Sequence, residues 1–302
     1  MEFEGVEIID TYAEAFKSYG ARILITARDE YWAKQAALTA IGFATSTIHC
    51  PCEAGIDTEV PASETPDNRP GIIVMFFAGR KKMNNVLLDR IGQCILTCPS
   101  TAVFDAYPES LVDEEKTKKY VAGKNLSFFG DGFQRKDDKT YPFITYKIPV
   151  MDGEFVIQSS FKYGKAIAGG NLIIQARDEA SALEAARKAV EAGSSVDWVI
   201  MPFPGGVVRS GSKVGSKYDF LTASTNDALC PTLKEKVDGS QVLDGVESVL
   251  EIVYDGLTEE AISKAMAASL QAAARVEGVV AISAGNYEGK LGKYHFHLKD
   301  LL

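Results

Sequence analysis

Hydrophobic and polar residues along the chain repeat with two periods, and each period predicts one kind of element. Apolar runs of strand length occur at 21–27, 71–79, 171–176, 247–257 and 278–286. Apolar residues at helical spacing predict helices at 29–43, 82–96, 178–193 and 258–278. Shorter patterns predict a helix at 11–16, opened by a capping box of Thr11 and Glu14, and strands at 46–50, 196–203 and 294–298, with one near Val103. Residues 51–57 read as a turn and 58–70 as a Pro-rich loop.

The two halves of the chain contain similar segments. ILITARDE begins at Ile23, and LIIQARDE begins at Leu172, close to half the chain later. A helix, a strand, a loop, a strand, a helix and a strand are predicted after each, as in a ferredoxin-like β-α-β-β-α-β unit. The sequence therefore predicts an α/β fold (an α+β sandwich) of two similar ferredoxin-like lobes from internal duplication, 1–150 and 151–302. Each lobe should have a predominantly antiparallel sheet flanked by helices, and a β-hairpin region is expected within 125–150.

A polar, glycine-rich stretch at 202–232 is too long for an ordinary connection between elements. Glycine lets backbone amides approach a ligand, while serine, threonine, lysine and arginine supply hydroxyls and charge. These features predict an ordered loop that binds an anionic or strongly polar small molecule. Two alternatives stay open. The spacing of Gly206 and Gly211 is that of a phosphate-binding loop, although Ser212 precedes Lys213 where that motif has lysine first. The stretch can also be a structural Ω-type loop.

Composition narrows the class of protein. The chain has 302 residues, 46% hydrophobic and 24% charged, which is ordinary for a soluble globular protein with two domains or lobes. The net charge of −9 argues against nucleic acid and against an acidic membrane surface as partners. The acidic N-terminus lacks a signal-peptide pattern, and no apolar run approaches the span of a bilayer. We therefore expect a cytoplasmic protein.

The cysteines and histidines form no recognisable metal motif. Five cysteines, an odd number, indicate reduced thiols. Cys50 and Cys52 are separated by one residue, and Cys94 and Cys98 by three, whereas a zinc site usually needs pairs separated by two. Buried structural thiols are therefore the favoured interpretation, and no metal is predicted.

The acids are the remaining candidates for chemistry. No side-chain nucleophile with a recognisable base stands out, which favours transfer between two bound substrates over a covalent enzyme intermediate. Alternation in SVLEIVYDG places Glu251 between Val249 and Val253 on one face of a strand. If that face is covered, the pKa of Glu251 rises and the neutral acid can donate a hydrogen bond. The alternative is a half-exposed strand with Glu251 in solvent. Asn226 and Asp227 can orient a polar ligand, or simply form a turn.

Long motifs spread along the whole chain carry a family resemblance. The matching stretches are GVEIIDTYAEAF, CEAGI, ETPDNRPG, LLDRIGQC, SFFGDGFQ, IPVMDGEF, AGGN, PFPGGVV, SGSKVGSKY, ASTNDALCPT, EIVYDGL, and ISAGNYEGKLG through HLKDLL. In these the sequence resembles the formylmethanofuran–tetrahydromethanopterin formyltransferase family. VVRSGSKVGSKY and ITARDEYWA look more like the version in methylotrophic bacteria than the methanogen version.

The resemblance implies a reaction and a catalytic residue. The family moves a formyl group reversibly between formylmethanofuran and N5 of tetrahydromethanopterin, in a ternary complex, through a tetrahedral oxyanion and without a prosthetic group. Its key glutamate precedes I-V in a motif that ends in a G-L pair, and that position here is Glu251. We expect the polar loop to bind the coenzymes through Pro204, Gly205, Gly206, Ser212, Lys213, Ser216, Lys217, Ser224, Asn226 and Asp227.

The resemblance also implies partners, and it leaves alternatives. Archaeal members are homotetramers built from dimers, and bacterial versions work in a complex with a hydrolase that releases formate. One alternative is a catalytically silent subunit that binds coenzyme or has a structural role in such a complex. Another, reached without the resemblance, is a two-lobed enzyme for an anionic metabolite. The direction of flux, in methanogenesis or in methylotrophy, does not follow from the sequence.

Overall fold

The computed structural model describes residues 1–302, which form two compact units. The terminal unit consists of Met1–Phe16 and Ala168–Leu302, and the central unit of Lys17–Ile167. Two long strands, β3 (Tyr12–Thr26) and β11 (Phe161–Ala176), contribute residues to both units. The predicted lobes 1–150 and 151–302 divide the sequence by its repeat, and their boundary stays a prediction.

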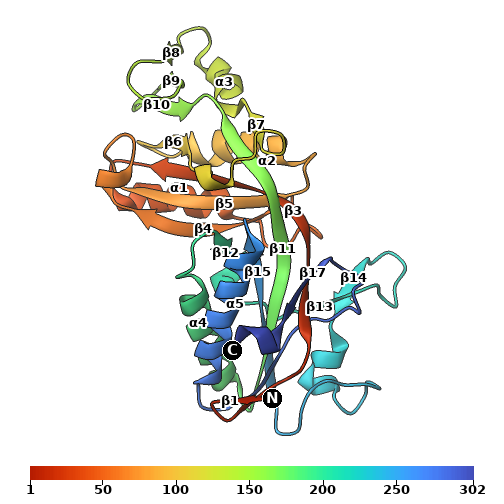
Figure 1. Ribbon diagram of the computed structural model, residues 1–302. Helices are drawn as coiled ribbons and strands as arrows, with labels where there is room; N and C mark the ends of the chain where they lie inside the picture. Colours follow the sequence, from red (N-terminus) through yellow and green to blue (C-terminus); the bar gives the residue numbers. More distant parts are fainter. The chain divides into compact units, whose positions relative to one another are not determined.

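The central unit contains the first β-α-β-β-α-β series (Figure 1). The series is β3, α1 (Glu30–Ile41), β4 (Glu53–Val60), β5 (Gly71–Ala78), α2 (Met83–Arg90) and β6 (Ala102–Asp105). The sheet order is β6-β3-β5-β4, and all three pairings are antiparallel. This is the strand order of a ferredoxin-like fold, so the predicted fold class is confirmed for this unit.

A second group of strands extends this sheet beyond β6. β10 (Gly153–Gln158) pairs with β6 in parallel, and β9 (Thr145–Val150) and β8 (Arg135–Asp137) follow in antiparallel order. The β8–β9 pair is the predicted hairpin region. β7 (Lys118–Tyr120) and the short helix α3 (Ala122–Ser127), which the sequence did not predict, precede it.

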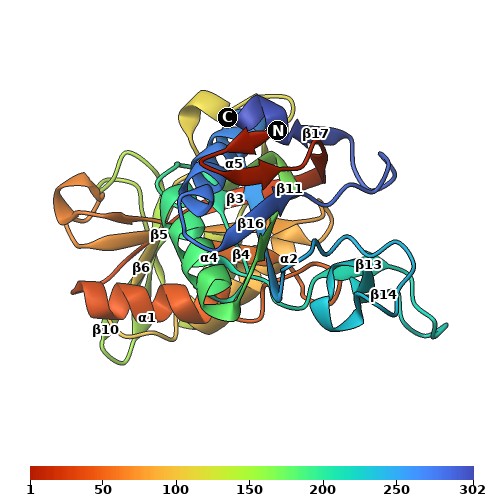
Figure 2. The same ribbon diagram turned by 90° about the horizontal axis from the view of Figure 1, so that it is seen from below.

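The terminal unit contains the second series (Figures 1 and 2). It runs through β11, α4 (Glu179–Gly193), β12 (Val199–Ile200), β15 (Ser248–Gly256), α5 (Glu259–Ala274) and β16 (Val279–Ser283). The sheet order β16-β11-β15-β12 matches that of the central unit, and α4 lies beside α5. At the chain ends, β2 (Val6–Ile8) joins β16 in parallel, β1 (Glu2–Phe3) pairs with β2, and β17 (Tyr294–His297) pairs with the start of β3.

The repeated sequence lies at the same place in both units. In each copy a strand ends, and an aspartate caps the helix that follows. The carboxylate of Asp29 accepts a hydrogen bond from the N–H of Trp32 at the start of α1. Asp178 does the same for the N–H of Ser181 at the start of α4. Such caps satisfy amides that have no partner within the helix, so the repeated Ala-Arg-Asp-Glu sets where each first helix begins.

The predicted helix at 11–16 is wrong, because residues 12–16 belong to strand β3. Residues Tyr12–Ala15 pair antiparallel with Tyr294–His297 of β17. The pattern of Thr11 and Glu14 resembled a capping box, but the carboxylate of Glu14 binds backbone amides of a distant loop instead. Pairing with a strand from the other end of the chain overrides the local helix signal.

The strand predicted at 46–50 and the turn at 51–57 are also wrong. Residues 46–50 form a turn, and β4 begins at Glu53. The predicted strand at 196–203 is reduced to β12, two residues long. Trp198 before it has a φ of 69°, and Pro202 after it has no N–H for a ladder.

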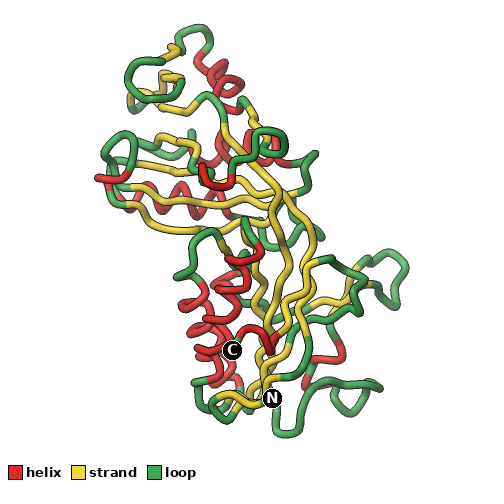
Figure 3. The backbone as a smooth tube through the Cα atoms, in the orientation of Figure 1, coloured by secondary structure: helices red, strands yellow, loops and turns green.

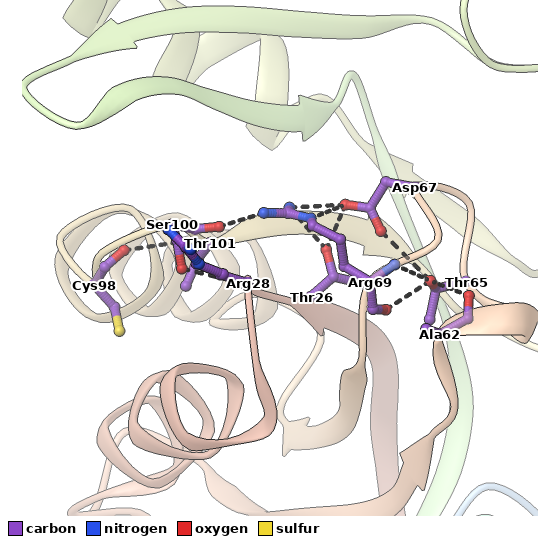
Figure 4. A network of polar contacts seen from close by, with 9 residues as sticks. All are labelled: Thr26, Arg28, Ala62, Thr65, Asp67, Arg69, Cys98, Ser100 and Thr101. Atoms are coloured by element: carbon purple, nitrogen blue, oxygen red, sulfur yellow. Dashed lines mark hydrogen bonds and ion pairs between the residues drawn. The ribbon is translucent and has the colours of Figure 1, made fainter.

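The two connections between the second and third strands differ. In the central unit, 61–70 is held by a polar network (Figure 4). Arg69 donates to Asp67 and to the hydroxyl of Thr26, and Thr26 donates to Asp67 at 2.7 Å. In the terminal unit, residues between β12 and β15 are mostly loop (Figure 3). They include the hairpin of β13 (Ser212–Val214) and β14 (Ala223–Thr225).

No helix of the chain has both the length and the apolar character that a membrane span requires.

Candidate active site

Glu251 lies in the middle of β15, where the strand alternates as the sequence predicts. Its neighbours Leu250 and Ile252 are buried, and Glu251 itself is half-buried. Its backbone makes a two-way pair with Val208: the N–H of Val208 donates to the Glu251 carbonyl at 2.7 Å, and the Glu251 N–H donates back at 2.9 Å. The polar segment that follows β12 therefore lies directly along β15 at the candidate acid.

The carboxyl group of Glu251 is oriented by Asn171 of β11. The side-chain N–H of Asn171 donates to Oε1 of Glu251 at 2.7 Å. The Asn171 carbonyl oxygen accepts the backbone N–H of Gly285 at 2.8 Å. Asn171 is 5% exposed, and a Cβ on Gly285 would lie 2.6 Å from its amide nitrogen. Both ends of the amide are thus bonded, which fixes which end faces Glu251.

Burial raises the pKa of Glu251, and the hydrogen bond from Asn171 partly opposes the rise. The cause is desolvation, because a carboxylate that is covered by other residues loses part of the hydration that stabilises its charge. A neutral Glu251 can donate a hydrogen bond to an electron-rich oxygen, whereas a carboxylate can only accept one. The face of β15 that carries Glu251 is neither fully covered nor fully open to solvent, since Val249 and Val253 beside it are also half-buried.

A loop at 285–292, after β16, contacts the same region. The hydroxyl of Tyr287 donates to the carbonyl of Ser212 at 3.2 Å. Burial raises the pKa of Tyr287, and the charges of Glu251 and Glu14 raise it further. A Cβ on Gly211 would lie 3.8 Å from Oε2 of Glu251. The start of hairpin β13–β14 and this loop therefore both lie beside the Glu251 carboxyl.

The predicted polar-loop residues divide into three groups. The first group, Ser212 and Asn226, adjoins Gly211, which lies near the Glu251 carboxyl. Ser212 follows Gly211 in the chain, and the N–H of Asn226 donates to the carbonyl of Gly211 at 3.3 Å. A second group forms contacts within the hairpin. Lys213 pairs with Asp227 at 2.5 Å, and the hydroxyl of Ser224 donates to the carbonyl of Gly215 at 2.8 Å.

The second group also includes Ser216 and exposed Lys217 at the hairpin tip, where the hydroxyl of Ser216 accepts the N–H of Tyr218. The third group, Pro204, Gly205 and Gly206, forms a short turn that packs on α4. Gly206 has a φ of 79°, and a Cβ there would lie 2.7 Å from the Val190 side chain. The turn's shape is thus fixed by packing on the helix.

The cysteines and histidines, which were the remaining candidates for a metal site, do not lie together at one site. The chain has no cluster of three or more His, Cys, Asp or Glu residues with the geometry of a metal site. All five cysteines are free thiols, and burial raises the pKa of Cys52 to about 11. His295 and His297 both lie against the ring of Tyr12.

Sequence reasoning missed three residues at this site: Glu14, Asn171 and Tyr287. Asn171 follows glycines in AGGN, a sign of close backbone packing around a polar side chain. Tyr287 lies in the glycine-containing segment AGNYEGKLG, which marks a loop but not its position. Only the fold brings these residues to Glu251, because 80 sequence positions separate Asn171 from the acid.

Two family models match the chain. Residues 1–150 match "Formylmethanofuran-tetrahydromethanopterin formyltransferase", and residues 153–301 match "FTR, proximal lobe". Among curated proteins, the enzyme named formylmethanofuran–tetrahydromethanopterin formyltransferase from Methanocaldococcus jannaschii is 51% identical, over 100% of this chain and 99% of the relative. The protein of that name from Methylococcus capsulatus is 48% identical over 100% of both.

Solved structures give the same result. The formyltransferase from Methanosarcina barkeri has a TM-score of 0.94 and 47% identity, and each chain is covered completely. A chain of the formyltransferase/hydrolase complex from Methylorubrum extorquens, solved with methylofuran, also has a TM-score of 0.94. It is 44% identical, over 100% of this chain and 98% of that chain.

Proposed function

Because this chain belongs to the formylmethanofuran–tetrahydromethanopterin formyltransferase family, we propose that Glu251 is the acid of a formyl transfer between those two coenzymes. The chain is a transferase of one-carbon metabolism that moves a formyl group between formylmethanofuran and tetrahydromethanopterin. The observation that carries the role of Glu251 is its carboxyl, whose pKa is raised by burial and which is oriented by Asn171.

The transfer follows from the chemistry of the two coenzymes. The lone pair of the pterin N5 attacks the formyl carbon, and the electrons of the carbonyl double bond move to its oxygen. The tetrahedral oxyanion then re-forms the carbonyl and expels the methanofuran nitrogen, which takes up a proton as N5 loses one. The nucleophile belongs to the substrate, so no catalytic serine or cysteine is needed.

A neutral Glu251 stabilises the oxyanion by donating a hydrogen bond to it. In other enzymes, removal of one such donor slows the reaction about 10²- to 10³-fold. The stabilisation is larger in a site with few water molecules, where the effective dielectric constant is low. Holding two large coenzymes in line supplies a further part of the rate.

The polar loop binds the coenzymes in this proposal. Ser212 and Asn226, beside Glu251, position the formyl amide, and Lys213 and Asp227 bind polar groups farther along. The remaining members act as ligands for the coenzyme tails: Pro204, Gly205, Gly206, Ser216, Lys217 and Ser224. The loop's hydroxyls, amides and charges suit such polar molecules.

The proposal extends to assembly and location. No prosthetic group takes part, and the two coenzymes enter as substrates. The protein is cytoplasmic and forms a homotetramer built from dimers, or it joins a hydrolase as its Methylorubrum extorquens relative does in a formyltransferase/hydrolase complex. Native mass spectrometry of the purified chain separates these two assemblies.

The test is formyl transfer by purified protein from formylmethanofuran to tetrahydromethanopterin, followed by absorbance. We expect activity in the natural protein and a decrease of about 10²- to 10³-fold in kcat for Glu251→Gln. Glu247→Gln, which changes an exposed acid just before the same strand, is the matched control and should retain activity. Activity that survives in Glu251→Gln would remove the oxyanion role. A natural protein that binds coenzyme without transfer would instead be a silent subunit.

A further inference from the structure

We propose that Glu14, far from Glu251 in sequence, is a positioning residue for the formyl transfer and acts by seating the loop at 285–292. The inference rests on the proposed role of Glu251 and adds Glu14, to which the sequence analysis gave no part in the reaction. Glu14 and the loop both lie within the terminal unit, since Glu14 belongs to Met1–Phe16 and the loop to Ala168–Leu302.

Glu14 binds the loop through five hydrogen bonds. Its Oε1 accepts the backbone N–H groups of Tyr287 at 2.5 Å and Gly289 at 2.7 Å. Its Oε2 accepts those of Leu291 at 2.9 Å and Gly292 at 3.3 Å. The backbone N–H of Glu14 also donates to the carbonyl of Gly285 at 3.2 Å. One side chain thus supplies the acceptors that a strand or helix would otherwise give these amides.

The carboxylate form is the one that fits this arrangement. Glu14 is only 1% exposed, and burial alone would raise its pKa. The four backbone amides outweigh burial and hold the pKa below its usual value. A carboxylate offers acceptor positions on both oxygens, whereas an amide would point its own N–H groups at two of these donors.

The seated loop fixes Glu251 from one side through Asn171. Gly285, at the start of the loop, donates its N–H to the Asn171 carbonyl, and the Asn171 amide donates to Glu251. If the loop moves, Asn171 loses the bond that sets its orientation. Its amide can then turn and present an oxygen, not an N–H, to the Glu251 carboxyl.

The loop also contacts the polar segment on the other side of Glu251. The Tyr287 hydroxyl donates to the carbonyl of Ser212, next to Gly211 at the Glu251 carboxyl. The loop packs closely on β3, because a Cβ on Gly292 would lie 2.0 Å from the carbonyl oxygen of Ala15. The loop is therefore a brace between β11 and the β13–β14 hairpin, and Glu14 is its anchor.

A merely structural role would predict a different outcome from a positioning role. A residue that only stabilises the fold lowers the amount of folded enzyme and leaves kcat per folded molecule unchanged. A residue that acts through Glu251 lowers kcat in proportion to the misplacement, and a shift of about 1 Å costs up to about 100-fold. Its effect should disappear once the Glu251 carboxyl has been replaced.

The experiment is a double-mutant cycle of Glu14→Gln and Glu251→Gln in the full chain. Alone, Glu14→Gln should lower kcat about 10- to 100-fold with a much smaller change in KM. In the Glu251→Gln background the same change should lower kcat by less than about twofold. Hydrogen exchange should accelerate at the amides of Tyr287, Gly289, Leu291 and Gly292. Glu288→Gln, an exposed acid on the same loop, is the matched control and should change neither readout.

Three outcomes would overturn the inference. Unchanged kcat in Glu14→Gln, or unchanged exchange in the loop, would show that the loop does not depend on this carboxylate. Equal effects in both backgrounds would show a structural role only. If Glu14→Gln does not fold, Glu14→Asp, which keeps the charge but is shorter, goes through the same cycle. If the natural protein transfers no formyl group but Glu14→Gln still accelerates exchange in the loop, the proposed function has failed while the binding of the loop by Glu14 is upheld.

Discussion

The third strands of the two units occupy the same place in the same sheet order, yet they carry different residues. β5 of the central unit is Gly71–Ala78, and all of its residues are buried. β15 of the terminal unit alternates between buried and half-buried positions, with Glu251 at its centre. β5 is buried along its whole length, whereas β15 carries an acid on its half-buried face.

The connections that precede these strands differ in the same way. The residues at 61–70 are closed by the hydrogen bonds of Arg69 and Asp67, which use up the side-chain donors and acceptors that a ligand would need. The residues between β12 and β15 form a longer segment whose backbone pairs with Glu251 through Val208. The shared fold thus fixes positions, and the chemistry depends on the residues that depart from the apolar pattern.

Replacing Phe76 on β5 should give the largest effect on stability and none on chemistry. Phe76 is fully buried in the core that also contains the alanines of α1. Phe76→Ala should lower the free energy of unfolding by about 3–5 kcal/mol, measured by urea denaturation, because it leaves a cavity. The kcat of the folded protein should be retained. Leu38→Ala on the exposed side of α1 is the control, and a decrease in kcat for Phe76→Ala would show that both third strands serve the reaction.

The corresponding change on β15 should have the opposite character. Glu251→Gln should lower kcat about 10²- to 10³-fold and leave the protein at least as stable. The natural carboxyl has a folded pKa above its unfolded value, so the native state binds the proton more tightly. The free energy of unfolding should therefore fall as pH rises through the folded pKa in the natural protein, but not in the variant.

The pH profile of kcat tests the same group independently. If the neutral acid is the donor, kcat of the natural protein decreases as pH rises through the pKa of Glu251. A profile that instead rises through that pKa would mean that the carboxylate is the active form.

Asn171 gives a smaller effect, and it links β15 to the rest of the terminal unit. Asn171→Ala should cost about 1–3 kcal/mol of stability, because it leaves the half-buried N–H of Gly285 without its acceptor. The alkaline decrease in kcat should move to higher pH, since the hydrogen bond from Asn171 lowers the pKa of Glu251. Asn125→Ala, an exposed asparagine of the central unit, is the control. An unshifted profile would contradict the orienting role.

The repeated helix caps should give the smallest effect and should be alike in both units. Asp29→Ala should lower the free energy of unfolding by about 1 kcal/mol through loss of the bond to Trp32. Asp178→Ala should likewise lower the Tm, through loss of the hydrogen bond that Asp178 accepts from the N–H of Ser181. Calorimetry measures both, and a large effect in only one unit would show that the two copies have different structural roles.

The sequence predicted well what depends on local pattern. Three of the four predicted helices lie within a few residues of their ranges, and Asp29 and Asp178 begin two of them. The helix predicted at 82–96 is α-helical only from Met83 to Arg90 and continues as a π-helix from Ile91 to Ile95. The strand order follows because the repeat of strand and helix allows few arrangements. The position of Glu251 on an alternating strand was also predicted, since its place between two valines at alternate positions is visible in the sequence.

What the sequence did not predict depends on contacts between distant residues. Glu14 resembled part of a helix cap, because Thr11 precedes it at the usual spacing. Its actual role requires a loop from the other end of the chain, which no local pattern shows. The polar loop was predicted as one binding segment, yet packing of Gly206 on α4 and pairing of Val208 with Glu251 give its parts separate surroundings.

The unit that contains Glu251 is built from segments at both ends of this sequence, which has a consequence for the order in which its strands can pair. β2 pairs with β16, and the first residues of β3 pair with β17. These N-terminal strands can therefore make these pairs only after β16 and β17 have been synthesised. During translation the central unit has all of its residues before Glu251 is synthesised. A nascent chain that stops short of β17 therefore lacks the strand that pairs with Glu14, and the strand pairing of the terminal unit forms only once β17 has been synthesised.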